Sequence, residues 1–520
     1  MPLTEDALIN ELARLERAND LPSAFRLLVA QPLPPNSLAT IAISLYRRDL
    51  SALAFLIVQK LLEAGVENWM LHAIAAHLAI RLGQDDMARH CIPRLAQLLA
   101  TAGDAQHAAA RQLLDPFLQR DVIMAFHTGN HALTSAYTQV WGAIEPATLT
   151  RLAPPPTERV PDLTRFYQPD DGAKLLYPAA PTANLPRAQR RAVLGIRHRW
   201  SPEQPDSREH DIPARYVLAL ESYGWRTNRQ DLRSLADAKI VAEDFEAIAA
   251  LCRETDADLL ILDDFQPQRG NHAAGRIIAA LRQERPTLKI VSLYFDPWQP
   301  ECWNDIEDGA GLLDGIWSLV VTPVWQRPAF AGKTLFLPFP HGGAYPAPLS
   351  LKPSFRFGGG VQYTNWDRAL WAAAITQAGL PQRIEASQHQ EDNRDPLESY
   401  RAYMLRAQTG EANLNFARRS NGTRTLTGRT FETLATGGLL VQERSDDIDL
   451  FFTAGRHYLR FETLTDLFDI AALLQQDPER AEAIRREGAA FFAERYSDEK
   501  LIAYLDQFLF HRESAARAAA

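Results

Sequence analysis

The first 150 or so residues show apolar side chains at helical spacing. Leu8, Leu12 and Leu15 form the apolar stripe of a first helix, which Thr4 can cap. After a break at Pro32–Pro35 the same period continues to about residue 144. It predicts further helices at 37–49, 50–64, 67–82, 85–102, 105–117, 121–128 and 131–144. We therefore expect residues 1–150 to form an all-helical domain.

This helical region contains an internal sequence repeat. Asp49 and Gly83 each occupy a turn between two expected helices and lie 34 positions apart (83 − 49). Ala54 and Ala88 follow these turns by the same distance, and a small residue there lets two helices approach closely. The period and the pattern resemble tetratricopeptide repeats, which dock a peptide, a protein or another subunit. The alternative is an irregular helical bundle.

The pattern changes after residue 150. Prolines recur through 151–188, and because a residue before proline avoids the helical region, we expect an extended linker there. From residue 189 to 340, short apolar runs alternate with amphipathic stretches, which predicts a doubly wound parallel sheet. The expected strands are 191–198, 225–228, 258–262, 288–293, 315–321 and 333–337, and the expected helices are 212–223, 242–255 and 272–284.

A second α/β domain is expected over 341–497. The proline- and glycine-rich stretch Pro338–Pro346 predicts the hinge into it. Phe355–Phe357 is its expected first strand, followed by Gly358–Gly360 and then by a helix at Asp367–Ala378. Glycines at the end of a strand permit the backbone to approach a ligand closely. Gly359 and Gly360 are therefore candidates for ligand contact.

Composition and charge narrow the class of protein. A hydrophobic content of 46% and a charged content of 23% are typical of globular domains. A chain of 520 residues is too long for a single hydrophobic core, so we expect more than one domain. The net charge of −9 argues against binding to nucleic acid or to anionic membranes. The three cysteines lack metal-ligand spacing, and no run of 18 apolar residues or signal peptide is present. We expect a cytoplasmic protein without an integral membrane segment.

The stretch Asn413–Glu432 has the densest candidate chemistry. A polar, Arg-rich loop leads into a short helix that Thr427 or Gly428 can cap. The helix ends at Gly437–Gly438, and Leu439–Val441 then predicts a buried strand. Together they predict a crossover unit of a parallel sheet, whose helix start presents free N–H groups to a phosphorylated ligand.

The sequence from Leu414 to Tyr496 resembles the C-terminal domain of GT-B glycosyltransferases, in particular a group-1-like family with spore-maturation-type (CgeB-like) domains. The shared strings are RTFETLATGGLLVQE, DLFFTAG, a Tyr-Leu-Arg-Phe strand and the helix DLFDIAALLQQDPERAEAIRREG. The resemblance implies two Rossmann-like domains and a last helix, within 498–520, that crosses back onto the first of them. It also implies transfer of a sugar from a nucleotide-sugar donor, without a metal. It does not extend to residues 1–150.

The resemblance assigns roles on the donor side. Arg429 is the first candidate for the donor diphosphate and Arg424 the second, while Glu432 matches the family glutamate that accepts hydrogen bonds from the ribose. If these residues bind no ligand, Arg429 would form an ion pair with Glu432 or Glu443. The carboxylate of Glu432 would then interact favourably with the helix dipole near the helix start. Related retaining enzymes carry a glutamate where Arg424 stands, so the stereochemical outcome stays open. The further candidates for donor contact are Asn421, Thr427, Thr430, His341, Gly359 and Gly360.

On the acceptor side, an inverting enzyme also needs a general base. The candidates are His198, His210, Asp211 and Asp296, in loops of the 189–340 domain. The alternatives are helix capping for Asp211 and a turn for Asp296. The acidic run 446–449 invites a metal interpretation, but its context favours a helix cap and solvated charge, so we expect neither a metal nor a cofactor.

The sequence thus predicts an α/β protein with two Rossmann-like domains (GT-B) after an all-α, repeat-like N-terminal domain. Its predicted function is that of a bacterial glycosyltransferase that uses a nucleotide sugar. The helical domain would recruit an acceptor, such as a protein or a surface glycan, or form a homo-oligomer. The alternatives are an inactive GT-B scaffold and a nucleotide-sugar epimerase. The sequence does not identify the sugar, the nucleotide base of the donor or the acceptor.

Overall fold

The computed structural model describes residues 3–31, 33–82, 84–170, 175–177, 179–181, 189–199, 209–294, 302–346, 348–361, 365–385, 395–408, 410–419, 422–445 and 447–511, without the side chains of 85, 109 and 111–119. The chain divides into two compact units. Unit 1 contains Met1–Thr157, Gly360–Leu380 and Thr463–Thr465, and unit 2 contains Glu158–Gly359, Pro381–Glu462 and Asp466–Ala520.

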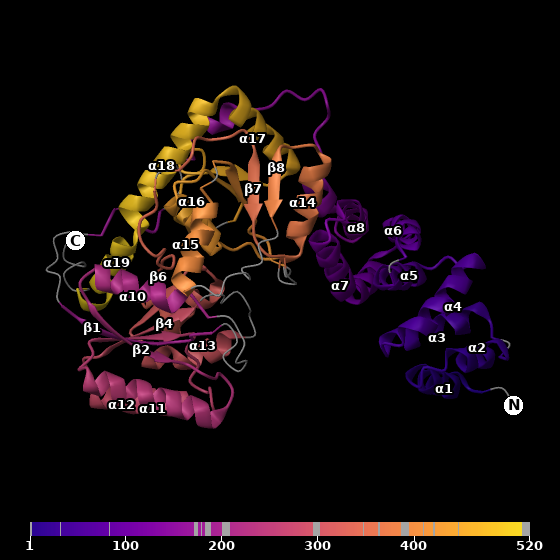
Figure 1. The fold of residues 1–520 in the computed structure, drawn as a ribbon, viewed down its shortest axis with the longest axis horizontal. Helices are drawn as coiled ribbons and strands as arrows, with labels where there is room; N and C mark the ends of the chain where they lie inside the picture. The colour runs from indigo at the N-terminus through magenta and orange to yellow at the C-terminus, as the bar shows by residue number, and fades with distance from the viewer. Residues whose placement is uncertain are drawn as a thin grey trace. The chain divides into compact units, whose positions relative to one another are not determined.

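Unit 1 is helical, as its apolar periodicity predicts (Figure 1). Its N-terminal helices are α1 (Glu5–Arg17), α2 (Leu21–Val29), α3 (Pro35–Arg47), α4 (Ser51–Glu63), α5 (Trp69–Arg81), α6 (Asp85–Ala100), α7 (Asp104–His127), α8 (His131–Ile144) and α9 (Pro146–Leu152). The prediction of separate helices at 105–117 and 121–128 is wrong, because α7 is continuous. No glycine or asparagine interrupts the chain between the two predicted segments, so nothing ends the first helix there.

Two helix pairs in unit 1 repeat at a fixed offset. α3 starts at Pro35 and α5 at Trp69, which is 34 positions later (69 − 35). α4 and α6 start at 51 and 85, with the same offset. α3 packs on α4 and α5 packs on α6. Ala54 and Ala88 are both buried, as helices in close approach require, while the predicted turn residue Gly83 lies outside the described residues.

Helix α14 (Asp367–Gln377) also belongs to unit 1, although it follows strand β7 in the chain. It packs against α7, α8 and α9. The ring of Trp366, which precedes α14, meets that of Trp141 edge to face, with centroids 4.5 Å apart. Arg151 is 6% exposed, lies 3.6 Å from Asp367 and stacks over Trp371. The helical domain is therefore completed by a helix from far along the sequence.

Unit 2 contains two parallel sheets. The first has the order β2-β1-β3-β4-β5-β6. Its strands are β1 (Arg191–Ile196), β2 (Arg226–Asp231), β3 (Leu259–Asp263), β4 (Lys289–Tyr294), β5 (Gly315–Ser318) and β6 (Thr334–Phe336). α10 (Ile212–Ser222) covers one face, while α11 (Ala238–Glu254) and α12 (Ala273–Glu284) cover the other (Figure 1). α13 (Trp303–Gly309) lies between β4 and β5 in the chain.

The second sheet has the order β11-β10-β9-β7-β8, again parallel throughout. Its strands are β7 (Phe355–Gly358), β8 (Gln382–Glu385), β9 (Ala412–Asn415), β10 (Leu440–Glu443) and β11 (Leu459–Phe461), and its helices are α15 (Pro396–Arg406), α16 (Gly428–Ala435) and α17 (Leu464–Gln476). The predicted fold class, two α/β sheets after an all-helical region, is confirmed. Gly437 has φ 71°, which is the left-handed helix ending that its glycine predicts.

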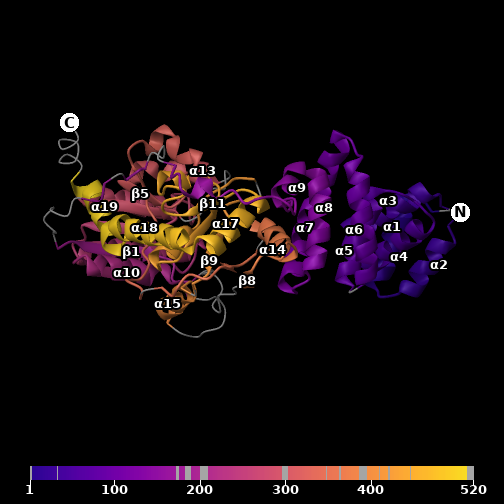
Figure 2. The ribbon, with the colours of Figure 1, turned by 90° about the horizontal axis from the view of Figure 1, so that it is seen from above.

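The last two helices, α18 (Pro478–Tyr496) and α19 (Asp498–Phe510), appear in yellow in Figures 1 and 2. α18 packs on α16, and α19 packs on α10 of the first sheet. A single apolar cluster includes Leu194 of β1, Phe431 of α16 and Leu505 of α19. The two sheets of unit 2 therefore share one continuous core.

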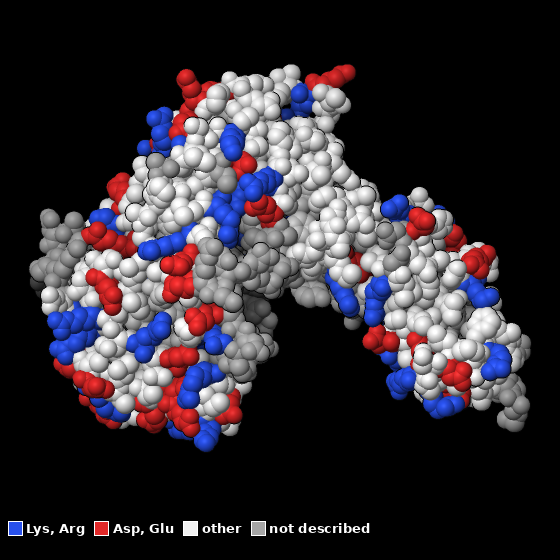
Figure 3. Space-filling view, viewed as in Figure 1, with Lys and Arg blue, Asp and Glu red and all other residues white. Residues whose placement is uncertain are grey.

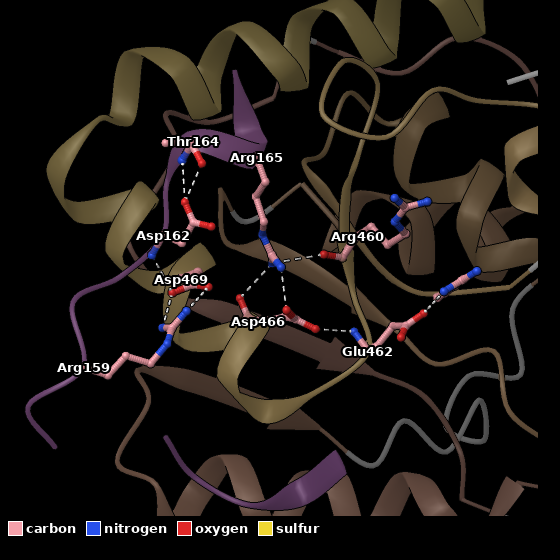
Figure 4. Close-up of polar contacts among 9 residues, drawn as sticks. Arg159, Asp162, Thr164, Arg165, Arg460, Glu462, Asp466 and Asp469 are labelled. Carbon is pink, nitrogen blue, oxygen red and sulfur yellow. Dashed lines mark hydrogen bonds and ion pairs between the residues drawn. The ribbon is translucent and has the colours of Figure 1, made fainter. Parts of the chain in front are cut away.

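The proline-rich segment after residue 157 is irregular, as predicted, and it is bound to the second sheet's helices. Arg159 donates two hydrogen bonds to the buried carboxylate of Asp469, which also accepts the Asp162 N–H (Figure 4). Arg165 pairs with Asp466. This segment (158–170) is therefore a strap over α17.

The face of each unit that Figure 3 shows has mixed charge. On the face shown in Figure 3, Lys and Arg side chains alternate with Asp and Glu. Such an interspersed pattern is typical of a solvated surface. None of the described helices combines the length and the apolar character that a membrane span needs.

Candidate functional site

The second sheet reverses its strand order between β7 and β9. β8 lies to one side of β7, and β9, β10 and β11 follow on the other. In parallel α/β sheets, ligands bind at the carboxyl ends of the strands next to such a reversal. Here these ends lead to Gly359 after β7, and to the loop between β9 and α16. Four of the predicted donor residues, Gly359, Thr427, Arg429 and Glu432, lie at this edge.

A buried polar network holds the first turn of α16 in place. The side-chain amide of Asn415 donates to the hydroxyl of Thr430 (2.8 Å) and to Gln442 (2.6 Å). Thr430 donates to the same Gln442 oxygen at 2.9 Å, and Thr427 donates to Asn415 at 3.0 Å. Because each buried polar group needs a partner, this network fixes α16 against β9 and β10. Both threonine hydroxyls, predicted to contact phosphate, are thus engaged within the protein.

Two buried carboxylates anchor the basic loop that precedes α16. Glu443 accepts the N–H groups of Ala417 (2.9 Å) and Arg418 (3.2 Å), and Asp447 accepts that of Leu426 (3.0 Å). Arg424 is exposed on this loop, and Asn421 lies outside the described residues.

The acidic run 446–449 is not the solvated charge that the sequence suggests. Asp447 is 6% exposed, and Asp449 accepts a hydrogen bond from the Tyr458 hydroxyl at 2.8 Å. These two carboxylates therefore hold loops together, while Asp446 lies outside the described residues. In the described part of the chain, no group of three His, Cys, Asp or Glu side chains is placed to hold a metal ion.

Arg429 is a cation to which the described residues supply no carboxylate partner. Its Cζ lies 5.3 Å from the centroid of the Phe357 ring, and its buried Nε has no hydrogen-bond partner among those residues. Within the described residues it forms no ion pair, because Glu443 binds backbone N–H groups and Glu432 is held by tyrosines. A Cβ on Gly359 would come within 2.8 Å of the Arg429 Cζ. Gly359 therefore has to be glycine to admit the guanidinium.

Gly360 is under no such constraint. A Cβ there would meet no described atom within 4 Å, and its carbonyl accepts a hydrogen bond from Arg368 at 3.2 Å. The two glycines, predicted alike as ligand contacts, thus differ in their surroundings.

Glu432 is oriented by two tyrosines of α15. The hydroxyl of Tyr400 donates to Oε1 at 3.2 Å, and that of Tyr403 donates to Oε2 at 3.0 Å. Burial raises the pKa of Tyr403 to about 12, the negative charge of Glu432 adds to this, and Arg429 opposes it. Tyr403 therefore stays protonated and donates to Glu432 at physiological pH.

Arg215 of α10 reaches α15 from the first sheet. Its guanidinium lies 4.0 Å from the centroid of the Tyr400 ring and donates to the Pro340 carbonyl at 2.8 Å. Its Nε lies 2.9 Å from the carboxylate of Asp211. Asp211 makes no side-chain capping bond to α10, so the structure gives it an ion pair in place of the helix cap considered as an alternative.

His341 is enclosed at the hinge between the sheets. Its ring packs edge to face on Phe492, and its backbone N–H donates to the Asp498 carboxylate at 2.6 Å. Burial lowers the pKa of the imidazole to about 3, so His341 is neutral at pH 7. A neutral, buried ring brings no positive charge to a phosphate, which weakens its predicted role as a donor ligand.

The base candidates differ in their hydrogen bonding. Burial lowers the pKa of His210 to about 4, and its Nδ1 faces the backbone N–H of Ile212 at 3.2 Å. Neutral His210 therefore carries its proton on Nε2, which cannot then accept another. The Nε2 of His198 lies 3.2 Å from Glu209. Asp296 lies outside the described residues.

The structure thus gathers Arg429, Glu432 and Gly359 at one sheet edge. Sequence reasoning missed Tyr400, Tyr403 and Arg215. A signal for the tyrosines was present: Asp395 caps α15, and proline follows at the first helical position. Two tyrosines three positions apart then share a helix face.

Comparison with known proteins bears on this region directly. Residues 351–507 match a family model described as "Glycosyl transferase-like". These residues form a glycosyl transferase-like domain. It contains Arg429, Glu432 and both tyrosines, and the predicted enzyme class, a glycosyltransferase, is confirmed.

Solved structures with a similar chain path include the following three. HepE of Anabaena, in complex with UDP and glucose, is 10% identical over 61% of this chain and 99% of its own, with a TM-score of 0.39. Sucrose-phosphate synthase of Thermosynechococcus elongatus is 12% identical over 63% of this chain and 100% of its own, with a TM-score of 0.40. T4 phage BGT, in complex with UDP and Mn²⁺, is 12% identical over 62% of this chain and 99% of its own, with a TM-score of 0.36. A search of curated protein sequences finds no match.

Proposed function

We propose that the glycosyltransferase domain binds a nucleotide-sugar donor at the edge formed by β7, β9 and α16, and that unit 2 transfers the sugar to an acceptor hydroxyl. The observation that carries this proposal is Arg429. Its guanidinium is held against Gly359 and Phe357 and has no carboxylate partner among the described residues. A partly buried cation of this kind is costly without an anion, and a diphosphate supplies one.

The first turn of α16 reinforces this site. Thr427 precedes the helix and makes no side-chain capping bond, so the backbone N–H groups at the helix start are not capped by it. N–H groups at a helix start favour anions, and a departing nucleoside diphosphate needs such stabilisation. We propose that Arg429 and this turn supply it without a metal ion, with the exposed Arg424 contributing from the preceding loop.

Glu432 would bind the donor's ribose. A carboxylate has about four lone-pair positions, and the tyrosines occupy one on each oxygen. Each oxygen therefore keeps acceptor capacity, which suits the two neighbouring hydroxyls of a ribose. For the general base, the His198–Glu209 pair is one candidate. Nε2 of His198 faces Glu209, so the buried Nδ1 would accept the proton, and Glu209 would stabilise the imidazolium that forms.

The helical unit would present the acceptor. Two helix pairs with the same 34-residue offset support a tetratricopeptide-like module, which would hold a polypeptide acceptor or a second copy of the chain. All three cysteines are free thiols, which supports a reducing compartment such as the bacterial cytoplasm.

The test is nucleotide binding by calorimetry. UDP, GDP, ADP, CDP and dTDP would be titrated into wild type, Arg429→Gln and Glu432→Gln, with Arg444→Gln as a control on an exposed ion pair. We expect one nucleotide to bind, roughly tenfold or greater loss in both site variants, no loss in the control, and no effect of EDTA. If no nucleotide binds, the inactive-scaffold alternative is correct.

A second measurement separates transferase from epimerase. The chain would be incubated with the nucleotide sugar whose base it binds. Release of the nucleoside diphosphate supports transfer, whereas a changed sugar that stays attached to the nucleotide would show epimerisation. Loss of binding on EDTA treatment would contradict the metal-independent proposal.

A further inference from the structure

Arg215 is a buried cation that belongs to the first sheet and contacts the second. It lies in α10 and is 5% exposed. Its guanidinium donates to the Pro340 carbonyl in the hinge and stacks 4.0 Å from the centroid of Tyr400 in α15. This side chain of α10 thus contacts both the hinge and the glycosyltransferase domain.

Tyr400 connects this cation to the donor carboxylate. The face of its ring packs on Arg215, and its hydroxyl donates to Glu432 at 3.2 Å. Burial opposes the charge of Arg215, yet Tyr400, Asp211 and Glu432 together raise the pKa of the guanidinium above its usual value. The arginine is therefore charged, and Glu432 contributes to holding it so.

We propose that Arg215 is a positioning residue for donor binding, which fixes Tyr400 and, through it, the orientation of Glu432. This inference rests on the proposed function, in which Glu432 binds the ribose. Arg215 would also couple that binding to the hinge, because the same guanidinium holds the Pro340 carbonyl. The acceptor-side sheet thereby contributes to donor recognition without touching the donor.

The physical reason lies in the lone-pair positions of the Glu432 carboxylate that the tyrosines do not occupy. A carboxylate recognises two neighbouring hydroxyls only when both of its oxygens face them, and a rotation about the side chain breaks that match. Tyr400 and Tyr403 prevent this rotation from opposite oxygens. Without Arg215, the Tyr400 ring loses its cation partner and Glu432 gains freedom.

The proposal predicts a change in selectivity. Loss of Arg215 should weaken binding of a ribonucleoside diphosphate more than binding of its 2′-deoxy analogue, because the analogue keeps only one of the two hydroxyls that Glu432 binds. A merely structural role would weaken both ligands alike. The ratio of the two dissociation constants is therefore the readout.

The experiment is calorimetry with the ribonucleoside diphosphate that wild type binds and with its 2′-deoxy form. The variants are Arg215→Met, which keeps the chain length without charge, Arg215→Lys and Tyr400→Phe. The control is Arg190→Met, since Arg190 also pairs with an aspartate (Asp506, 2.8 Å) and stacks on an aromatic ring (Phe510, 3.5 Å), away from Glu432. Tyr400→Phe keeps the ring and tests the chain of contacts if Arg215→Met fails to fold.

We expect wild type to prefer the ribonucleotide by about tenfold, the loss of one to two hydrogen bonds. Arg215→Met and Tyr400→Phe should reduce this preference to that of Glu432→Gln, Arg215→Lys should restore part of it, and Arg190→Met should retain it. A retained preference in Arg215→Met, or an equal loss for both ligands, would overturn this proposal alone. No preference in wild type, with Glu432→Gln unchanged, would overturn the ribose assignment as well.

Discussion

The guanidinium of Arg429 packs where a side chain on Gly359 would have to lie, since a Cβ there would come within 2.8 Å of its Cζ. Neither Gly358, Gly359 nor Gly360 has a positive φ, so backbone conformation does not explain a glycine at 359. The glycine is explained by the arginine. A strand end and a helix start far apart in sequence are thus fitted to each other.

Gly359→Ala should weaken nucleotide binding by about tenfold, because the methyl group displaces Arg429 from its place beside the helix start. Gly360→Ala is the matched control, since a Cβ there meets no described atom within 4 Å. Calorimetry with the nucleotide bound by wild type makes the measurement. Equal losses in both variants would show that the glycines face the ligand directly.

Thr430→Val should destabilise the glycosyltransferase domain by about 1–3 kcal/mol, because a buried Asn415 N–H loses its acceptor and the Gln442 oxygen loses one of its two donors. Thr436→Val is the control, since among the described residues its hydroxyl bonds to the Thr433 carbonyl one turn away. Thermal unfolding should show the larger fall for Thr430→Val. Similar falls would mean that the network adds nothing beyond an ordinary helix hydroxyl.

Stability should fall as the pH drops below 6.5 towards about 3. The pKa of buried His341 is lowered from the ordinary 6.5 to about 3, so in this interval the unfolded chain binds a proton that the folded chain does not. His210 and His457, each lowered to about 4 by burial, act in the same direction. Thermal unfolding at a series of pH values should show a shallower decline for His341→Gln than for wild type. A parallel decline would show that the site contributes nothing, and the exposed His90→Gln serves as control.

Asp469→Asn should release the strap formed by 158–170. The variant removes the charge of a carboxylate, 2% exposed, that holds both Arg159 and the Asp162 backbone. Trypsin should then cut within the strap several times faster than in wild type. Asp170→Asn is the control, because its pairing with Arg460 is half-exposed. Unchanged cleavage in Asp469→Asn would show that apolar contacts alone hold the strap.

Strand β9 is one element that sequence reasoning missed. It was not predicted because Asn413 and Asn415 interrupt its apolar pattern, yet both are buried in the middle of the second sheet. A buried asparagine is stable only with partners, and those of Asn415 come from α16 and β10. Local pattern cannot show such partners, because they lie 15 and 27 positions away.

The α/β class, the helical N-terminal region and the candidates Arg429 and Glu432 could be predicted from sequence, because apolar periodicity, helix-ending glycines and a motif are local properties. How these residues are used depends on the packing of distant segments. This packing gave Glu432 its tyrosine partners, brought Arg215 from the other sheet, and placed α14 in the helical unit. Such contacts depend on how distant segments pack, and a buried charge or amide is defined by its neighbours in space rather than along the chain.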